Sequence, residues 1–199
     1  MHYKKHLGKD KKLKKLILKQ GELVLEGKKN AFMHLCLSIL SQQLSVKVAT
    51  VIKGRFLALY GGKFPGPKEI LDTPVTRFRE IGFSNAKASY VHNVAKFAVS
   101  HGMDDKKLNK MSDEEVIEYL TQIKGVGRWT TEMLLMFALK REDVFALDDL
   151  GIQMAMAGLY ELDISDRKKL KSAMAAIAEQ WSPYRTYACL YLWRWKDEE

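Results

Sequence analysis

The chain has 199 residues, of which 47% are hydrophobic and 29% are charged, and it carries a formal net charge of +9. This length fits one sizeable core or two small lobes, and the near-average composition excludes a largely disordered chain. The positive charge favours an anionic partner such as nucleic acid. No apolar run approaches the roughly 20 residues of a membrane-spanning helix, and the N-terminus lacks the apolar region of a signal peptide. We therefore expect no membrane partner and a soluble intracellular protein.

The elements expected along the chain are helices. A lysine-rich amphipathic helix begins near Lys11, where a solvated face is favoured over phosphate contact. An apolar helix over 30–40 ends at a polar break, and Ser45 opens a further helix to about Tyr60. Short helices follow near 68–71 and 74–79, and Ser84 is the expected N-cap of a long amphipathic helix. Because no stretch shows sustained period-two alternation, we predict an all-α fold.

The cysteines and histidines do not predict a cofactor. Cys36 and Cys189 each lie in an apolar helical stretch, so we expect buried, reduced thiols. Two cysteines cannot supply the four ligands of an iron–sulfur cluster, and the five histidines show no metal-ligand spacing. We expect no cofactor and no catalytic metal.

A glycine-punctuated hairpin is the most distinctive local pattern. Ser112 and Glu115 match a capping box at the start of a helix over 113–121. Gly125 and Gly127 allow a tight turn with exposed backbone N–H groups, and Arg128 opens a second helix. Such N–H groups suit a phosphate oxygen, although the glycine pattern alone favours an ordinary helical hairpin.

Several segments together carry a family resemblance. They are the sequence IKGVGRW at 123–129, the apolar helix after it, the sequence DVFALDD at 143–149, the stretch 181–188, and 41–45. In these the chain, from about Asn30 onward, resembles the helix-hairpin-helix DNA glycosylases that have a glycine/proline-rich loop and a catalytic aspartate. Within that superfamily it is most similar to the alkylated-base, or 3-methyladenine DNA glycosylase II, branch, in a minimal form without the N-terminal β-rich domain.

The resemblance implies a two-lobed helical bundle with an active-site cleft between the lobes. One lobe is expected over about 30–110 and the other over about 111–199, and residues 1–29 could pack on the second. The helix-hairpin-helix motif itself is expected over about 112–140.

The resemblance also implies the residues of the active site. The catalytic aspartate is the second of the acidic pair, Asp149, with Asp148 as the runner-up, and an N-cap role for Asp149 is compatible with catalysis. A carboxylate there would stabilise positive charge on the deoxyribose as the N-glycosidic bond breaks. Bifunctional relatives have a lysine nucleophile where this chain has Trp129, and an indole cannot form a Schiff base.

The remaining site residues fall into three groups. Base-pocket candidates are Trp129, Trp193, Met133 and Tyr187; DNA-binding candidates are Lys124, Gly125, Val126, Gly127, Arg128 and Thr130; wedge candidates are Gln42, Gln43 and Leu44. Core packing is the competing interpretation for the aromatic residues of the base pocket, and it is the preferred interpretation for Trp181 and Trp195. A monovalent cation at the hairpin backbone is a further option.

The resulting prediction is a monofunctional glycosylase without lyase activity. It would excise methylated purines such as 3-methyladenine and 7-methylguanine from double-stranded DNA, as a monomer, and so initiate base excision repair. The location expected with this function is cytoplasmic, nucleoid-associated in a prokaryote or nuclear in a eukaryote. The alternative is a non-catalytic helix-hairpin-helix DNA-binding module. A third hypothesis, a lyase acting on oxidised bases, is disfavoured by Trp129 and by the lack of a cysteine cluster.

Overall fold

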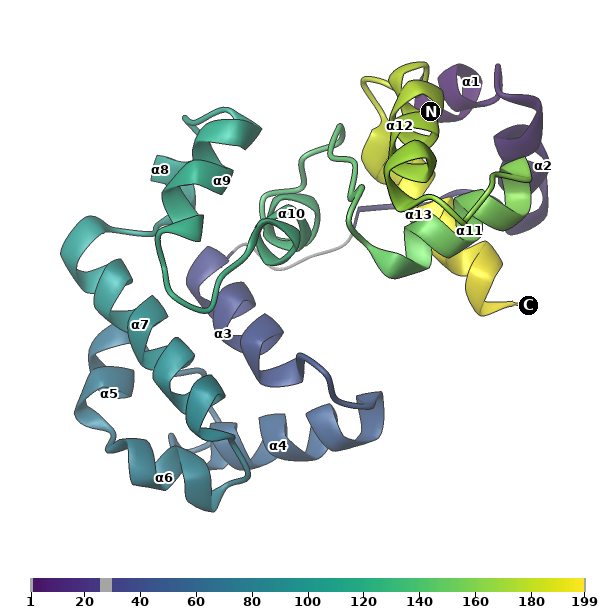
Figure 1. Cartoon of the computed structure of the whole chain (residues 1–199). Coiled ribbons are helices and arrows are strands. Elements are labelled where there is room, and N and C mark those ends of the chain that lie inside the picture. Colours follow the sequence, from purple (N-terminus) through teal and green to yellow (C-terminus); the bar gives the residue numbers. More distant parts are fainter. Residues whose placement is uncertain (1, 26–29, 199) are drawn as a thin grey trace. The chain divides into compact units, whose positions relative to one another are not determined.

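The computed structural model describes residues 2–25 and 30–198, and every regular element within those ranges is a helix (Figure 1). The predicted all-α fold is confirmed. No helix of the described ranges is both long and apolar enough to cross a membrane.

The helices follow one another with short connections. Most of the helices expected from periodicity and capping occur within a few residues of their predicted bounds. Three helices were not predicted from the sequence: His2–Leu7, Asp105–Leu108 and Arg167–Glu179. The elements are α1 His2–Leu7, α2 Lys11–Gln20, α3 Ala31–Ser41, α4 Val46–Ala58, α5 Pro67–Asp72, α6 Val75–Glu80, α7 Asn85–His101, α8 Asp105–Leu108, α9 Asp113–Thr121, α10 Arg128–Phe137, α11 Leu150–Tyr160, α12 Arg167–Glu179 and α13 Arg185–Asp197.

The chain divides into two compact units, Lys28–Leu134 and Met1–Gly27 with Leu135–Glu199, so the division falls within α10. The sequence had placed it near residue 110. The difference arises because α9 and the hairpin are bound to α7 and α8. The Tyr119 hydroxyl donates to the carbonyl oxygen of Gly102 at 2.8 Å, and Lys107 Nζ donates to that same hydroxyl at 2.7 Å. These contacts keep α9 in the unit Lys28–Leu134.

The unit Lys28–Leu134 is built around α7, which packs against α3, α5 and α6. The predicted cap is present: Ser84 Oγ accepts the Lys87 N–H at 3.2 Å. The core beside α7 is aromatic, with Phe56, Phe78 and Phe83 stacked or tilted against one another at centroid distances of 5.6 to 6.0 Å. This packing orients α7 and therefore the hairpin that lies on it.

The second unit is built around α13, which packs against α2 and α11. The Tyr3 ring stacks on Tyr187 at 4.0 Å between centroids, and the Tyr191 hydroxyl donates to the carbonyl oxygen of Gly21 at 2.7 Å. The N-terminal helices therefore belong with the C-terminal ones. Residues 1 and 26–29 of the segment expected to pack there lie outside the described residues.

A buried carboxylate joins three segments of this unit: α2, α11 and the turn after α12. Asp10 is only 9% exposed, and it caps α2 by accepting the N–H groups of Lys12 and Leu13 at 2.8 and 3.1 Å. Its other oxygen accepts the Tyr160 hydroxyl at 2.7 Å and Trp181 Nε1 at 3.0 Å. Removing the carboxylate would leave these two donors without their acceptor, which costs more than the loss of a cap alone.

We predict that Asp10→Ala lowers the free energy of unfolding by roughly 3 kcal/mol, since a cap is lost and two largely buried donors lose their acceptor. The matched control is Asp166→Ala, which removes the carboxylate that caps α12 through Lys168 and Lys169. It should cost about 1 kcal/mol. Urea unfolding at neutral pH measures both, and equal losses would contradict the role assigned to Asp10.

Candidate active site

The hairpin between α9 and α10 has the predicted capping box and glycine turn. Ser112 Oγ accepts the Glu115 N–H at 3.3 Å, and the Glu115 carboxylate accepts the Ser112 N–H at 2.6 Å. The turn closes where the Val126 N–H donates to the carbonyl oxygen of Ile123 at 2.9 Å. Gly125 has a φ of 104°, a conformation that side chains oppose.

The turn lies directly on α7. A Cβ atom on Gly125 would come within 2.2 Å of Tyr90 Cγ, so only glycine permits this approach. Asn93, one turn along α7 from Tyr90, donates through Nδ2 to the carbonyl oxygen of Lys124 at 3.0 Å and holds the same loop. The hairpin conformation is therefore set by α7 as well as by its own turn.

The six residues expected to bind DNA have different surroundings. Lys124 and Gly127 are exposed, whereas the side chains of Val126 and Thr130 are buried. Both terminal nitrogens of Arg128 donate to Glu114 at 2.8 Å. This hydrogen bonding raises the pKa of Arg128 and lowers the pKa of Glu114.

The Arg128 side chain also donates through Nε to Glu132 Oε1 at 3.2 Å. Because Glu114 lies on α9 and Glu132 on α10, the guanidinium joins the two helices of the hairpin. Its charge is already engaged by carboxylates, so the main-chain N–H groups beside it are better placed to meet a phosphate than the side chain is.

The predicted wedge segment forms a tight turn after α3. The Leu44 N–H donates to the carbonyl oxygen of Ser41 at 3.2 Å, and Gln43 has a φ of 55°, in the left-handed region. Lys87 Nζ donates to the carbonyl oxygens of Leu40 and Gln42 at 2.8 and 2.7 Å. Burial lowers the pKa of Lys87. The sequence did not identify this lysine, because in an amphipathic helix it resembles any solvated residue.

A pocket of about 390 Å³ brings the wedge candidates together with Trp129. It is lined by Ser38, Ser41, Gln42, Gln43 and Trp129, and the Trp129 side chain is 40% exposed. Two separate predictions, the base-pocket wall and the wedge, therefore fall on one surface. Leu44, the third wedge candidate, is half-buried and does not line this pocket.

The acidic pair has one exposed and one half-buried member. Asp148 is exposed and pairs with Lys171. Asp149 is the N-cap of α11, as predicted: its Oδ1 atom accepts the Ile152 N–H at 2.8 Å. The same oxygen accepts Trp193 Nε1 at 2.9 Å. One oxygen of this carboxylate is therefore held by donors from two helices, α11 and α13.

The other base-pocket candidates are packed within helices. Met133 is 9% exposed in α10. Tyr187 is stacked on Tyr3, and its hydroxyl donates to Glu142 at 2.9 Å. Burial raises the pKa of this hydroxyl. Trp181 is fully buried, as expected for a core residue, and Trp195 is half-buried.

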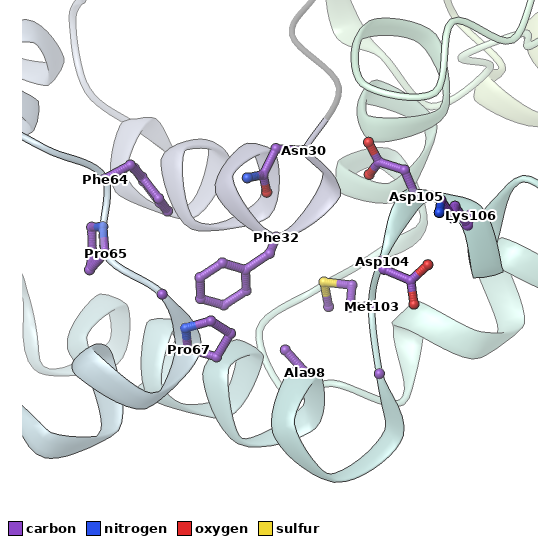
Figure 2. Close-up of a pocket in the computed structure, with 12 residues that line it drawn as sticks. Asn30, Phe32, Phe64, Pro65, Pro67, Ala98, Met103, Asp104, Asp105 and Lys106 are labelled. Carbon is purple, nitrogen blue, oxygen red and sulfur yellow. The ribbon is translucent and has the colours of Figure 1, made fainter.

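A pocket of about 830 Å³ lies elsewhere in the unit Lys28–Leu134, and Figure 2 shows Phe32, Pro67 and Met103 around it. None of the predicted site residues lines it. Asp104 and Asp105 stand at its edge, and each accepts a backbone N–H, at 3.0 and 2.9 Å. A phosphate would meet two carboxylates here, so the size of this pocket does not make it a DNA site.

Metal ligands do not gather in the described part of the chain, where no three His, Cys, Asp or Glu side chains could share an ion. Cys36 and Cys189 are buried thiols, as predicted, and Cys189 Sγ donates to the carbonyl oxygen of Val144. A monovalent cation held by backbone oxygens of the hairpin would need no such side chains, and it stays a prediction.

A family model of the HhH-GPD superfamily of base excision DNA repair proteins matches residues 36–183. The chain belongs to this superfamily. The matched range contains the wedge turn, the hairpin and Asp149, so the motifs of the HhH-GPD family occupy both units of the fold.

Relatives of this HhH-GPD protein carry names consistent with the predicted branch. It is 39% identical over 171 residues to DNA-3-methyladenine glycosylase 1 of Schizosaccharomyces pombe, covering 84% of the chain and 73% of the relative. A solved structure of the S. pombe 3-methyladenine DNA glycosylase in complex with abasic DNA matches with a TM-score of 0.86 at 36% identity, over 98% of this chain and 96% of that one. A DNA-3-methyladenine glycosidase of Bacillus halodurans matches with a TM-score of 0.87 at 37% identity, over 98% and 89%.

We predict that Gly125→Ala lowers the free energy of unfolding by roughly 2–4 kcal/mol, because its Cβ would displace Tyr90 and its φ opposes a side chain. Gly127→Ala is the matched control two residues on, with no heavy atom within 4 Å of the new methyl group. That change should stay within about 0.5 kcal/mol of the wild type. Urea unfolding of both variants tests the pair, and a loss in Gly127→Ala as large as in Gly125→Ala would show that the contact with Tyr90 is not the cause.

Proposed function

We propose that this HhH-GPD protein is a monofunctional DNA glycosylase that hydrolyses the N-glycosidic bond of alkylated purines, such as 3-methyladenine and 7-methylguanine, in double-stranded DNA. It would act as a monomer and initiate base excision repair. The observation that carries the proposal is Asp149, a carboxylate held at the start of α11 by two donors to one oxygen. The names of the relatives support the choice of alkylated bases.

The chemistry requires an anion beside a developing cation. As the N-glycosidic bond lengthens, positive charge grows on the deoxyribose, and a fixed carboxylate stabilises that charge more than water would. Asp149 would supply the carboxylate, or would orient the attacking water. Because an alkylated purine already carries positive charge, it leaves without a strong general acid.

The hairpin would hold the DNA backbone. Lys124 is exposed, and Gly127 presents no side chain at the start of α10. The first intrahelical bond of α10 runs from the Thr131 N–H to the carbonyl oxygen of Gly127 at 3.1 Å. N–H groups in the first turn of a helix lack intrahelical acceptors and attract anions. Contact of this kind gives affinity without sequence preference.

Trp129 and the turn Ser41–Leu44 would handle the extruded base. An electron-rich indole face binds a cationic base well, and Trp129 is exposed at the edge of the pocket that Gln42 and Gln43 line. Gln43 would fill the gap that the base leaves in the duplex. The indole in place of an amine predicts hydrolysis without a Schiff base or strand cleavage.

The non-catalytic alternative explains the hairpin and the net charge of +9 but gives Asp149 no role beyond its cap. The two functions differ in one measurement. A binding module would retain alkylated DNA without releasing any base from it, whereas a glycosylase would release free methylated purines.

We predict that Asp149→Asn loses base release by at least roughly 100-fold, because a neutral amide cannot stabilise the sugar cation. Asparagine keeps an oxygen acceptor for Ile152 and Trp193, so folding and DNA affinity should change little. The matched control is Asp148→Asn, which removes the exposed partner of Lys171 and should retain activity. Release of methylated purines from alkylated duplex DNA, measured by chromatography, tests all three proteins.

Each outcome of that assay has a distinct meaning. Full activity in Asp149→Asn with loss in Asp148→Asn would exchange the roles of the two carboxylates. Absence of base release from the wild type would contradict the enzymatic proposal and favour the binding module.

Gln43 allows a test of strain against function. We predict that Gln43→Gly raises the free energy of unfolding by about 0.5–1 kcal/mol, since glycine tolerates a positive φ, and yet slows base release. Gln42→Gly is the control, because Gln42 has a φ of −49° and no strain to relieve. If Gln43→Gly kept full activity on duplex substrate, the wedge role would be wrong.

A further inference from the structure

The carboxylate proposed for catalysis is held by two different helices. Its Oδ1 atom accepts the Ile152 N–H of α11 at 2.8 Å and Trp193 Nε1 of α13 at 2.9 Å. The first contact is an ordinary N-cap. The second comes from a residue 44 positions away and is not needed to start the helix.

Gly151 leaves the room for this contact. A Cβ atom at Gly151 would lie 3.0 Å from Asp149 Oδ1 and 3.2 and 3.3 Å from Cδ1 and Nε1 of Trp193. Alanine is a far better helix former than glycine, so helix formation alone would favour alanine at the second position of α11. The lower helix propensity of glycine is explained if the Trp193 indole must reach the Asp149 carboxylate past this position.

The indole is itself oriented by packing. Its ring lies 6.1 Å from the Phe137 ring, between centroids, at an angle of 33°, and its side chain is half-buried. A donor whose own ring is held in this way restricts rotation of the carboxylate that accepts from it.

We propose that Trp193 is a positioning residue that holds Asp149 in its reactive orientation, and that Gly151 is required for this contact. The inference rests on the proposed function of Asp149. In the positioning role Trp193 acts through the N–H edge of its indole, whereas in a base-stacking role it would act through the face of the ring. The two roles separate in Trp193→Phe, which keeps an aromatic face and loses the donor.

Trp193→Phe should lower the single-turnover rate constant of base release roughly 10- to 100-fold, as expected for loss of a hydrogen bond to a charged group. The DNA concentration that gives half-maximal rate should not change. Trp195→Phe is the control on the same helix, and it should keep the wild-type rate. In a proton–nitrogen NMR spectrum, the indole signal that Trp193→Phe removes should also shift in Asp149→Asn.

Gly151→Ala tests the contact without removing the indole. Helix propensity offsets part of the lost hydrogen bond, so the melting temperature should fall less than in Trp193→Phe while the rate constant still falls. Gly158→Ala is its counterpart, because the new methyl group would lie 3.3 Å from Trp195 Cη2 on the same pair of helices, far along α11 from Asp149. It should leave the rate unchanged.

The double variant Gly151→Ala with Trp193→Phe should be little slower than the slower of the two single variants, since both changes remove one contact. Wild-type rates in Trp193→Phe, or an indole signal that ignores Asp149→Asn, would overturn the positioning role while the proposed function stands. A wild-type protein that releases no base would overturn both.

Discussion

The proposed chemistry of this protein depends on one carboxylate at the start of a helix. Asp149 begins α11 by accepting the Ile152 N–H, and the same oxygen accepts the indole N–H of Trp193. A charged group fixed in this way has little reorganisation left to undergo when positive charge appears on a sugar. Its neighbour Asp148 is exposed and paired with Lys171, so the two adjacent aspartates have different environments.

Close approach at glycine recurs in the parts of the fold that matter for function. Gly125 lets the hairpin lie on the Tyr90 ring, and Gly151 leaves room for Trp193 beside Asp149. At Gly125 a methyl group would overlap the Tyr90 ring, and at Gly151 it would press against the Asp149 carboxylate and the Trp193 indole. Such glycines are needed for packing, and their helix or turn propensity alone would not explain them. Both contacts also join segments that are distant in sequence.

Charged residues of the hairpin form ion pairs within the protein, in addition to any contact they make with phosphate. Arg128, the first residue of α10, donates to Glu114 on α9 and to Glu132 on α10, so it links the two helices of the hairpin. The expectation that this arginine meets phosphate therefore competes with its internal ion pairs. Lys87 of α7 acts similarly at the wedge turn, where its ammonium group donates to the carbonyl oxygens of Leu40 and Gln42.

The sequence by itself determined the all-α class, the capping box at Ser112, the cap at Asp149 and the membership of the HhH-GPD superfamily. These rest on local patterns, because caps and helical periods depend on residues only a few positions apart. The tertiary structure decided what distant segments do to one another. It assigned α9 and the hairpin to the unit of α7, placed Gln43 in a left-handed conformation beside Trp129, and brought the Trp193 indole to Asp149. No local pattern encodes these contacts, since each requires two helices to pack before their side chains can meet.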